Sequence, residues 1–156
     1  MTMFHKLQGV FPIGDFVLGC KFRDGAVKLY DVEPLMQEIP VFAYFKEHPD
    51  TFRQVTVSPG GYGIIWNDEL DLDAEEIWVN GWPEWDENNL VTVEVEIDSV
   101  LLKQAADYLK PYALLPEDWM VMCLEALVYP ATQGKTIKLL LDRQEGQNIT
   151  ERCENP

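Results

Sequence analysis

The chain has 156 residues, of which 47% are hydrophobic and 12% aromatic. This content favours a folded protein over a disordered one, because a chain of this length buries enough apolar surface to fold without disulfides or a structural metal. The net charge of -15 weighs against a nucleic-acid partner, since an acidic protein repels phosphate backbones, and it favours a basic partner.

The cysteines Cys20, Cys123 and Cys153 lie far apart and form no CxxC pair, so they do not outline a disulfide framework or a zinc site. The first residues lack the pattern of a signal peptide, and no stretch approaches the ~20 apolar residues that a membrane helix needs. We therefore expect a cytoplasmic protein that does not insert into a membrane.

Residues 16–31 predict a β-hairpin. Phe16, Leu18, Cys20 and Phe22 alternate with smaller or polar residues, and the Asp-Gly pair at 24–25 is typical of a tight turn before a second strand over residues 26–31. Residues 34–52 are cut by prolines into short helical turns, which we expect to cross over one face of a sheet.

A second strand pair is predicted over residues 54–57 and 62–66, because the intervening glycines permit a chain reversal. The two pairs together indicate a small antiparallel sheet of about four strands. An acidic run at 67–76 follows, in which Asp73 is placed to cap a short helix that begins at Ala74.

These segments follow a pattern of a strand, F-x-DG, a strand ending in Asp, a short helix, F-x-x-V, and a tryptophan strand followed by D-L-x-x-E. Over residues 10–80 the chain resembles the bacterial family of domain of unknown function 2442, except for Trp78, where tyrosine is more usual. The resemblance implies a small α+β domain over residues 1–80, without an established activity. Some relatives lie beside toxin genes as suspected antitoxins. The matching residues are Phe22, Asp24, Gly25, Asp31, Leu35, Phe52, Val55, Trp66, Asp71, Leu72 and Glu75.

Residues 81–89 are polar, contain a proline and lack any period, so we interpret them as a linker. Trp82 and Trp85 within it have two possible roles. They fold the linker onto the first domain, or they line a groove for a partner.

Residues 90–142 predict a strand-helix-helix module. Val91, Val93, Val95 and Ile97 alternate with polar residues, which is typical of a strand. An amphipathic helix follows, capped by Asp98 or Ser99, and a second helix begins at Pro116. The body of the second helix is apolar on nearly every side, with Glu125 as its one charge, so we expect the first domain or a second copy of the chain to cover it.

The order of one strand and two helices resembles the ribbon-helix-helix module of the RelB and DinJ antitoxins. In that family two chains pair their strands and bury their second helices against each other, which implies a homodimer here. It also implies a toxin-like, basic protein as partner. The residues that we expect at such an interface are Val93, Val95, Ile97, Trp119, Met122, Leu124 and Leu127.

DNA binding through this module is the main alternative function. The outward residues of the ribbon would be Thr92, Glu94 and Glu96, whereas base contacts in the major groove need basic or amide groups. Carboxylates that face phosphates add repulsion. We therefore expect DNA binding to be weak or lost.

Enzymatic chemistry has little support in the sequence. His5 and His48 lack the neighbours of a catalytic or zinc site. The acidic run lacks the glycine and the spacing of a calcium loop, so a metal-dependent enzyme is a third and weaker alternative. We expect no catalytic, cofactor or metal residues, and we interpret residues 143–156 as a flexible tail. The residues of the acidic run considered as ligands are Asp68, Glu69, Asp71, Asp73, Glu75 and Glu76.

Overall fold

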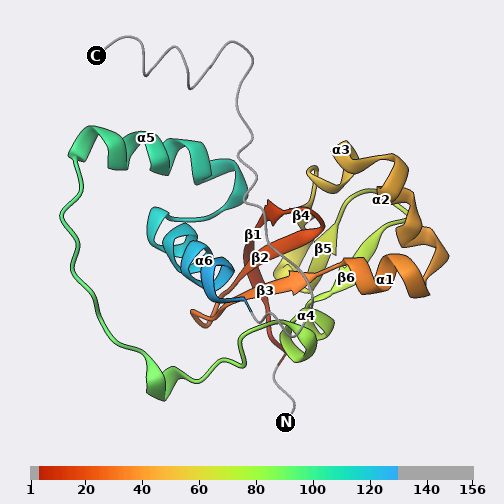
Figure 1. Ribbon diagram of the computed structural model, residues 1–156, viewed down its shortest axis with the longest axis horizontal. Helices are drawn as coiled ribbons and strands as arrows, with labels where there is room; N and C mark the ends of the chain where they lie inside the picture. Colours follow the sequence, from red (N-terminus) through yellow and green to blue (C-terminus); the bar gives the residue numbers. More distant parts are fainter. Residues whose placement is uncertain (1–3, 130–156) are drawn as a thin grey trace.

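The computed structural model describes residues 4–129. Figure 1 shows two small sheets in the middle of the molecule, with helices α1 to α3 on one side and α5 and α6 on the other. This arrangement is a mixed α+β fold, as the sequence predicts. The predicted tail at 143–156 and the end of the second module lie outside the described residues.

The first sheet is antiparallel, in the order β1 (Leu7–Gly14), β2 (Val17–Phe22) and β3 (Val27–Asp31). The predicted hairpin is confirmed: β2 pairs with β3, and Gly25 takes a φ of 109° in the turn between them. The Asp24 carboxylate accepts a hydrogen bond from the backbone N–H of Ala26 at 3.1 Å. Strand β1 was not predicted, because nearly all of its residues are buried and it therefore lacks an apolar/polar alternation.

Short helices then follow β3, and their buried residues Met36, Phe42, Phe45 and Phe52 join the core on one face of the first sheet. The helices are α1 (Glu33–Glu38), the 3-10 turn η1 (Pro40–Ala43), α2 (Tyr44–Glu47) and α3 (Pro49–Phe52). The second sheet consists of β4 (Thr56–Val57), β5 (Gly63–Ile65) and β6 (Asp71–Asp73), with the 3-10 turn η2 (Pro59–Gly61) between β4 and β5. The described residues thus form two three-stranded sheets, where the sequence predicted about four strands.

Helix α4 (Ala74–Asn80) begins where the sequence predicts. The Asp73 carboxylate accepts a hydrogen bond from the backbone N–H of Glu75 at 2.8 Å, which confirms the N-cap. Part of the acidic run is thereby fixed in structure: residues 71–73 form β6, and Glu76 accepts a hydrogen bond from the Tyr30 hydroxyl at 3.0 Å.

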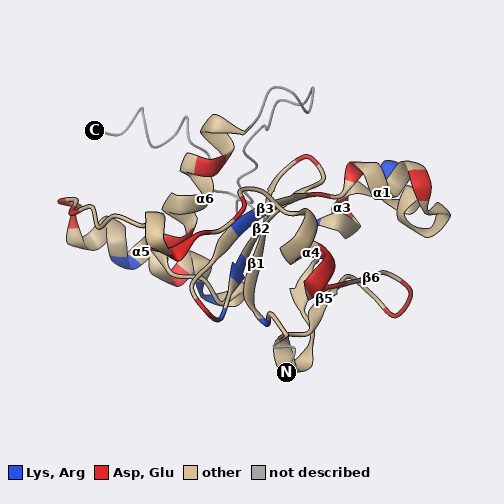
Figure 2. Cartoon of the chain, turned by 90° about the horizontal axis from the view of Figure 1, so that it is seen from below, with Lys and Arg blue, Asp and Glu red and all other residues tan. Residues whose placement is uncertain are grey.

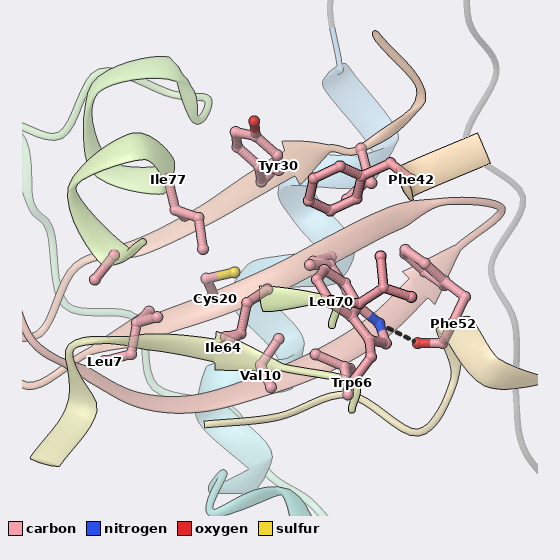
Figure 3. Packing of buried hydrophobic residues seen from close by; sticks show 14 of the residues in the cluster. Leu7, Val10, Cys20, Tyr30, Phe42, Phe52, Ile64, Trp66, Leu70 and Ile77 are labelled. Atoms are coloured by element: carbon pink, nitrogen blue, oxygen red, sulfur yellow. Dashed lines mark hydrogen bonds between the residues drawn. The ribbon is translucent and has the colours of Figure 1, made fainter. Parts of the chain in front are cut away.

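An apolar core fills the space between the two sheets and helices α1 to α3. Figure 3 shows Leu7, Val10 and Cys20 of the first sheet facing Ile64 of the second, with Phe42 and Phe52 closing the cluster beside Trp66. The Trp66 indole N–H donates a buried hydrogen bond to the carbonyl oxygen of Phe52 at 2.9 Å. This bond ties helix α3 to the strand pair that follows it.

We expect Trp66→Phe to lower the free energy of unfolding by about 1–2 kcal/mol, because the buried carbonyl of Phe52 loses its donor while most of the aromatic packing remains. Chemical denaturation monitored by circular dichroism measures the change. Trp78→Phe is the control for loss of a tryptophan, since no hydrogen bond involving the Trp78 indole is recorded among the described residues. Equal losses for the two variants would contradict a role for the hydrogen bond.

The second half of the described chain contains the 3-10 turn η3 (Glu87–Asn89), helix α5 (Ser99–Leu109), the 3-10 turn η4 (Lys110–Tyr112) and helix α6 (Pro116–Val128). The Asp98 carboxylate accepts a hydrogen bond from the N–H of Leu101 at 2.9 Å, so Asp98 is the N-cap of α5. Both helices were predicted from the sequence.

The strand predicted at 91–97 is absent from the described structure. Residues 90–98 form an extended, exposed connection that pairs with neither sheet, and Figure 1 shows it running away from the sheets before α5 begins. The physical reason is the lack of a neighbour, because a strand is stable only when another strand satisfies its backbone groups.

Helix α6 packs on the face of the first sheet that is remote from the main core. A second apolar cluster joins Phe11, Val17 and Leu29 of the sheet to Leu109, Leu114 and Met122. Within the single chain Leu124, Leu127 and Val128 of α6 are exposed, so cover of this side of the helix by a second copy of the chain stays a prediction. The first domain covers one side of the helix only.

Candidate interaction surface

The second half of the chain carries an unusual concentration of exposed apolar side chains. Eighteen large apolar residues are exposed in residues 4–129, and twelve of them lie between residues 90 and 128. Exposed apolar side chains that gather into a large patch mark interaction sites, so this concentration along the chain makes residues 90–128 a candidate for such a site. We call these twelve residues the module surface: Leu90, Val91, Val93, Val95, Val100, Leu101, Leu102, Tyr108, Leu115, Leu124, Leu127 and Val128.

The extended segment supplies the most exposed part of the module surface. Val91 is 84% exposed and Val93 is 75% exposed. Val95 is exposed as well, whereas Ile97 is half-buried. Because the described segment lies in no ladder, its backbone groups are free to pair with a strand from outside the chain.

The interface residues predicted on α6 fall on different sides of the helix. Met122 is fully buried against the first sheet, and Trp119 is half-buried. Leu124 and Leu127 face solvent, with Leu127 at 79% exposure. Leu124 and Leu127 are therefore available to a partner in this structure, whereas Met122 is occupied within the chain.

Two glycines let the α5–α6 unit approach the first sheet closely. A methyl group added at Gly9 would lie 2.5 Å from the carbonyl oxygen of Tyr112, and one added at Gly19 would overlap the Met122 sulfur. An ion pair supports the contact: the Lys21 ammonium lies 2.7 Å from the buried Asp118 carboxylate. The same carboxylate accepts a hydrogen bond from the N–H of Leu115 at the start of α6.

Glu125 is the unexpected residue of this contact. Its side chain is buried between α6 and the first sheet, and neither carboxylate oxygen has a hydrogen-bond partner among the described residues. Burial raises the pKa of Glu125 from 4.5 to about 8, and the charge of Lys28 opposes the rise. The Lys28 ammonium lies on the other side of the sheet, where it donates a hydrogen bond to the Trp78 carbonyl oxygen. The sequence prediction placed this charge on a helix without identifying that it turns inward.

Trp82 and Trp85 are half-buried and pack against the apolar clusters. The backbone of Trp82 exchanges two hydrogen bonds with Leu29 at the edge of the first sheet, and its ring contacts Tyr129 edge to face at 5.6 Å. This placement agrees with a linker folded onto the first domain. A groove between the two tryptophans for a partner stays a prediction.

The histidines and acidic residues considered as catalytic or metal-binding groups do not form a common site in the described residues. His5 stacks on Trp78 and contacts the Glu75 carboxylate at 3.0 Å, whereas His48 stacks on Tyr44. Within residues 4–129 no three side chains of His, Cys, Asp or Glu are grouped so that they could hold a metal ion. None of the helices in the same range combines the length and hydrophobicity that crossing a membrane requires.

One concave site was not predicted from the sequence. A groove of about 610 Å³ lies between η1, α2 and the loop that joins β5 to β6. Its lining residues come from two segments more than twenty positions apart, so neither segment alone indicates it. They are Pro40, Val41, Tyr44, Asn67, Asp68, Glu69 and Leu70.

Comparison with protein families agrees with the resemblance seen in the first half of the sequence. Residues 8–81 match the model of a family described as protein of unknown function, DUF2442. The match ends at the linker and leaves the second module uncovered. No curated protein and no solved structure matches the chain. The likeness of residues 90–130 to the RelB and DinJ antitoxins therefore stays a hypothesis.

Proposed function

We propose that the protein is a non-enzymatic, antitoxin-like interaction protein that forms a homodimer through residues 90–128 and binds a basic partner. The observation that carries the dimer is the module surface, in which an unpaired, alternating segment is followed by helices with exposed apolar faces. Burying such a surface against a second copy removes apolar area from water and satisfies the free backbone groups at the same time.

Charge disfavours some registers of the paired segments. In a two-fold antiparallel pair centred on Val93, Val91 lies opposite Val95 and Glu94 lies opposite Thr92. A pair centred on Glu94 would instead place two carboxylates directly opposite each other, which is destabilising. We therefore propose that Val93 lies on the two-fold axis of the dimer.

Val93→Pro tests the dimer without disturbing the monomer. Proline removes the N–H that the pairing needs, while the extended and exposed backbone at this position tolerates it. We expect the unaltered protein to be a dimer at micromolar concentration by sedimentation equilibrium, and Val93→Pro to be a monomer with an unchanged circular dichroism spectrum. Val93→Ile is the matched control and stays dimeric. A monomeric unaltered protein would contradict the proposal.

The basic partner is supported by the net charge of -15, because complementary charge steers association. The product of a neighbouring gene is the partner to test first. If it is a small basic protein that arrests growth, co-expression with this chain is expected to relieve the arrest, and the two proteins are expected to copurify. DNA binding is the competing outcome, and a nanomolar gel shift with the upstream promoter at ordinary salt would favour it.

A further inference from the structure

The groove between α2 and the β5–β6 loop combines an aromatic and aliphatic wall with free carboxylates. Val41 and Tyr44 stand on one side, and Leu70 is buried beneath. Tyr44 is 44% exposed, and its ring is held by stacking on His48, with the ring centroids 3.9 Å apart and the planes within 6°. The aromatic wall is therefore fixed in position while much of the side chain remains accessible.

The acidic wall of the groove belongs to the β5–β6 loop, part of which is red in Figure 2. The Asn67 side chain shapes this loop by accepting hydrogen bonds from the N–H groups of Glu69 and Leu70, at 2.9 and 3.0 Å. Asp68 and Glu69 themselves are exposed, and their carboxylates make no ion pair or hydrogen bond within residues 4–129. Two negative charges are thus presented at the groove by a loop that other groups hold in place.

We infer that this groove binds a cationic side chain, arginine or lysine, of a basic protein partner. An arginine or lysine side chain has an apolar stem and a charged end, which match the exposed Val41 side chain and the two carboxylates. The Tyr44 ring adds a face on which a guanidinium can stack. The inference deepens the proposed function, on which it rests, because it assigns a site to the basic partner.

Charge complementarity decides in favour of a cation. The groove lining contains two carboxylates and no basic residue, and the chain as a whole carries a charge of -15. An anionic or nucleic-acid ligand would be repelled by the two groove carboxylates and by the net negative charge of the whole chain. A neutral apolar ligand would leave the carboxylates unused, and it would bind with little dependence on salt.

The test uses the full chain and an acetylated, amidated tri-arginine peptide, with the tri-citrulline peptide as its neutral counterpart. Titration followed by NMR is expected to shift the amide signals of residues 40–44 and 67–70. The tri-arginine peptide binds more tightly at about 50 mM than at about 300 mM salt, and the tri-citrulline peptide binds at least about tenfold more weakly. Comparing the affinities of the tri-arginine and tri-lysine peptides shows whether stacking on Tyr44 favours a guanidinium over an ammonium group.

Matched variants separate the site from general charge. Asp68→Asn with Glu69→Gln removes two negative charges at the groove, and Glu87→Gln with Glu117→Gln removes the same number from exposed positions on η3 and α6, away from the groove. The first pair is expected to weaken tri-arginine binding about tenfold, and the second by less than about twofold. Tyr44→Leu weakens tri-arginine binding more than tri-lysine binding.

Equal weakening by the two double variants, or signal changes that lie away from the groove, would overturn the inference. Failure of this site is distinguishable from failure of the dimer, because sedimentation reports the dimer without any peptide. A chain that dimerises but does not bind the peptide at the groove rejects the cation site alone. A chain that binds the peptide but stays monomeric rejects the dimer alone.

Discussion

The free energy of unfolding is expected to fall as the pH rises from about 4.5 to about 8, and Glu125→Gln is expected to abolish most of this fall. The cause is the burial of Glu125 under α6, which raises the pKa of its carboxyl group from 4.5 to about 8 in the folded protein. Between these two values the folded protein keeps a proton that the unfolded chain has lost. Each rise in pH within this range therefore lowers the free energy of unfolding.

The size of the effect follows from the difference between the two pKa values. It corresponds to roughly 3–5 kcal/mol, fully available below pH 4.5 and lost once the pH passes about 8. The Lys28 ammonium opposes this effect because it favours the charged carboxylate. Burial is the main cause of the raised pKa of the Cys20 thiol, to which the Glu125 carboxylate adds, so this thiol stays neutral over the range.

Denaturation by urea at pH 5 and at pH 9 measures the effect in the unaltered protein and in Glu125→Gln. The two proteins are expected to be nearly equally stable at pH 5, and the variant more stable by roughly 3–5 kcal/mol at pH 9. Glu117→Gln, on the exposed side of the same helix, is the control and leaves the pH dependence unchanged. Parallel pH profiles for the unaltered protein and Glu125→Gln would contradict the assignment.

Features that depend on nearby residues were predictable from the sequence. The hairpin turn at Gly25 and the N-cap at Asp73 each require only a few neighbouring residues, and the structure has both. The segment at 91–97 shows the limit of this reasoning. Its alternation predicts a strand correctly only if a partner is present, and the single chain provides none.

Features that depend on distant segments were not predictable. The sequence around Gly9 and Gly19 does not indicate that these glycines let the α5–α6 unit pack closely on the first sheet. The helix that they contact lies about a hundred residues further along the chain. The inward turn of Glu125 follows from that same contact. The groove at Tyr44 arises from two segments that each look ordinary alone, so its free carboxylates were interpreted as part of a solvated run.

Gly9→Val is expected to lower the free energy of unfolding by about 3 kcal/mol and to loosen the α5–α6 unit from the first sheet. A methyl group at this position would lie 2.5 Å from the Tyr112 carbonyl oxygen and 2.8 Å from that of Ala113. Both atoms belong to the backbone of the turn that precedes α6, so the turn must move away as a whole. Overpacking against a rigid neighbour costs this much, since no side-chain rotation relieves it.

Gly19→Ala is the matched control for this prediction. The three atoms nearest to its added methyl group all belong to the side chain of Met122, whose flexible thioether turns aside. We expect a loss of about 1 kcal/mol, and limited proteolysis within residues 83–98 no faster than in the unaltered protein. In Gly9→Val the same segment is cut faster, because the helices that hold its far end are loosened. If Gly9→Val proves as stable as Gly19→Ala, the close backbone contact between the first sheet and the turn before α6 is wrong.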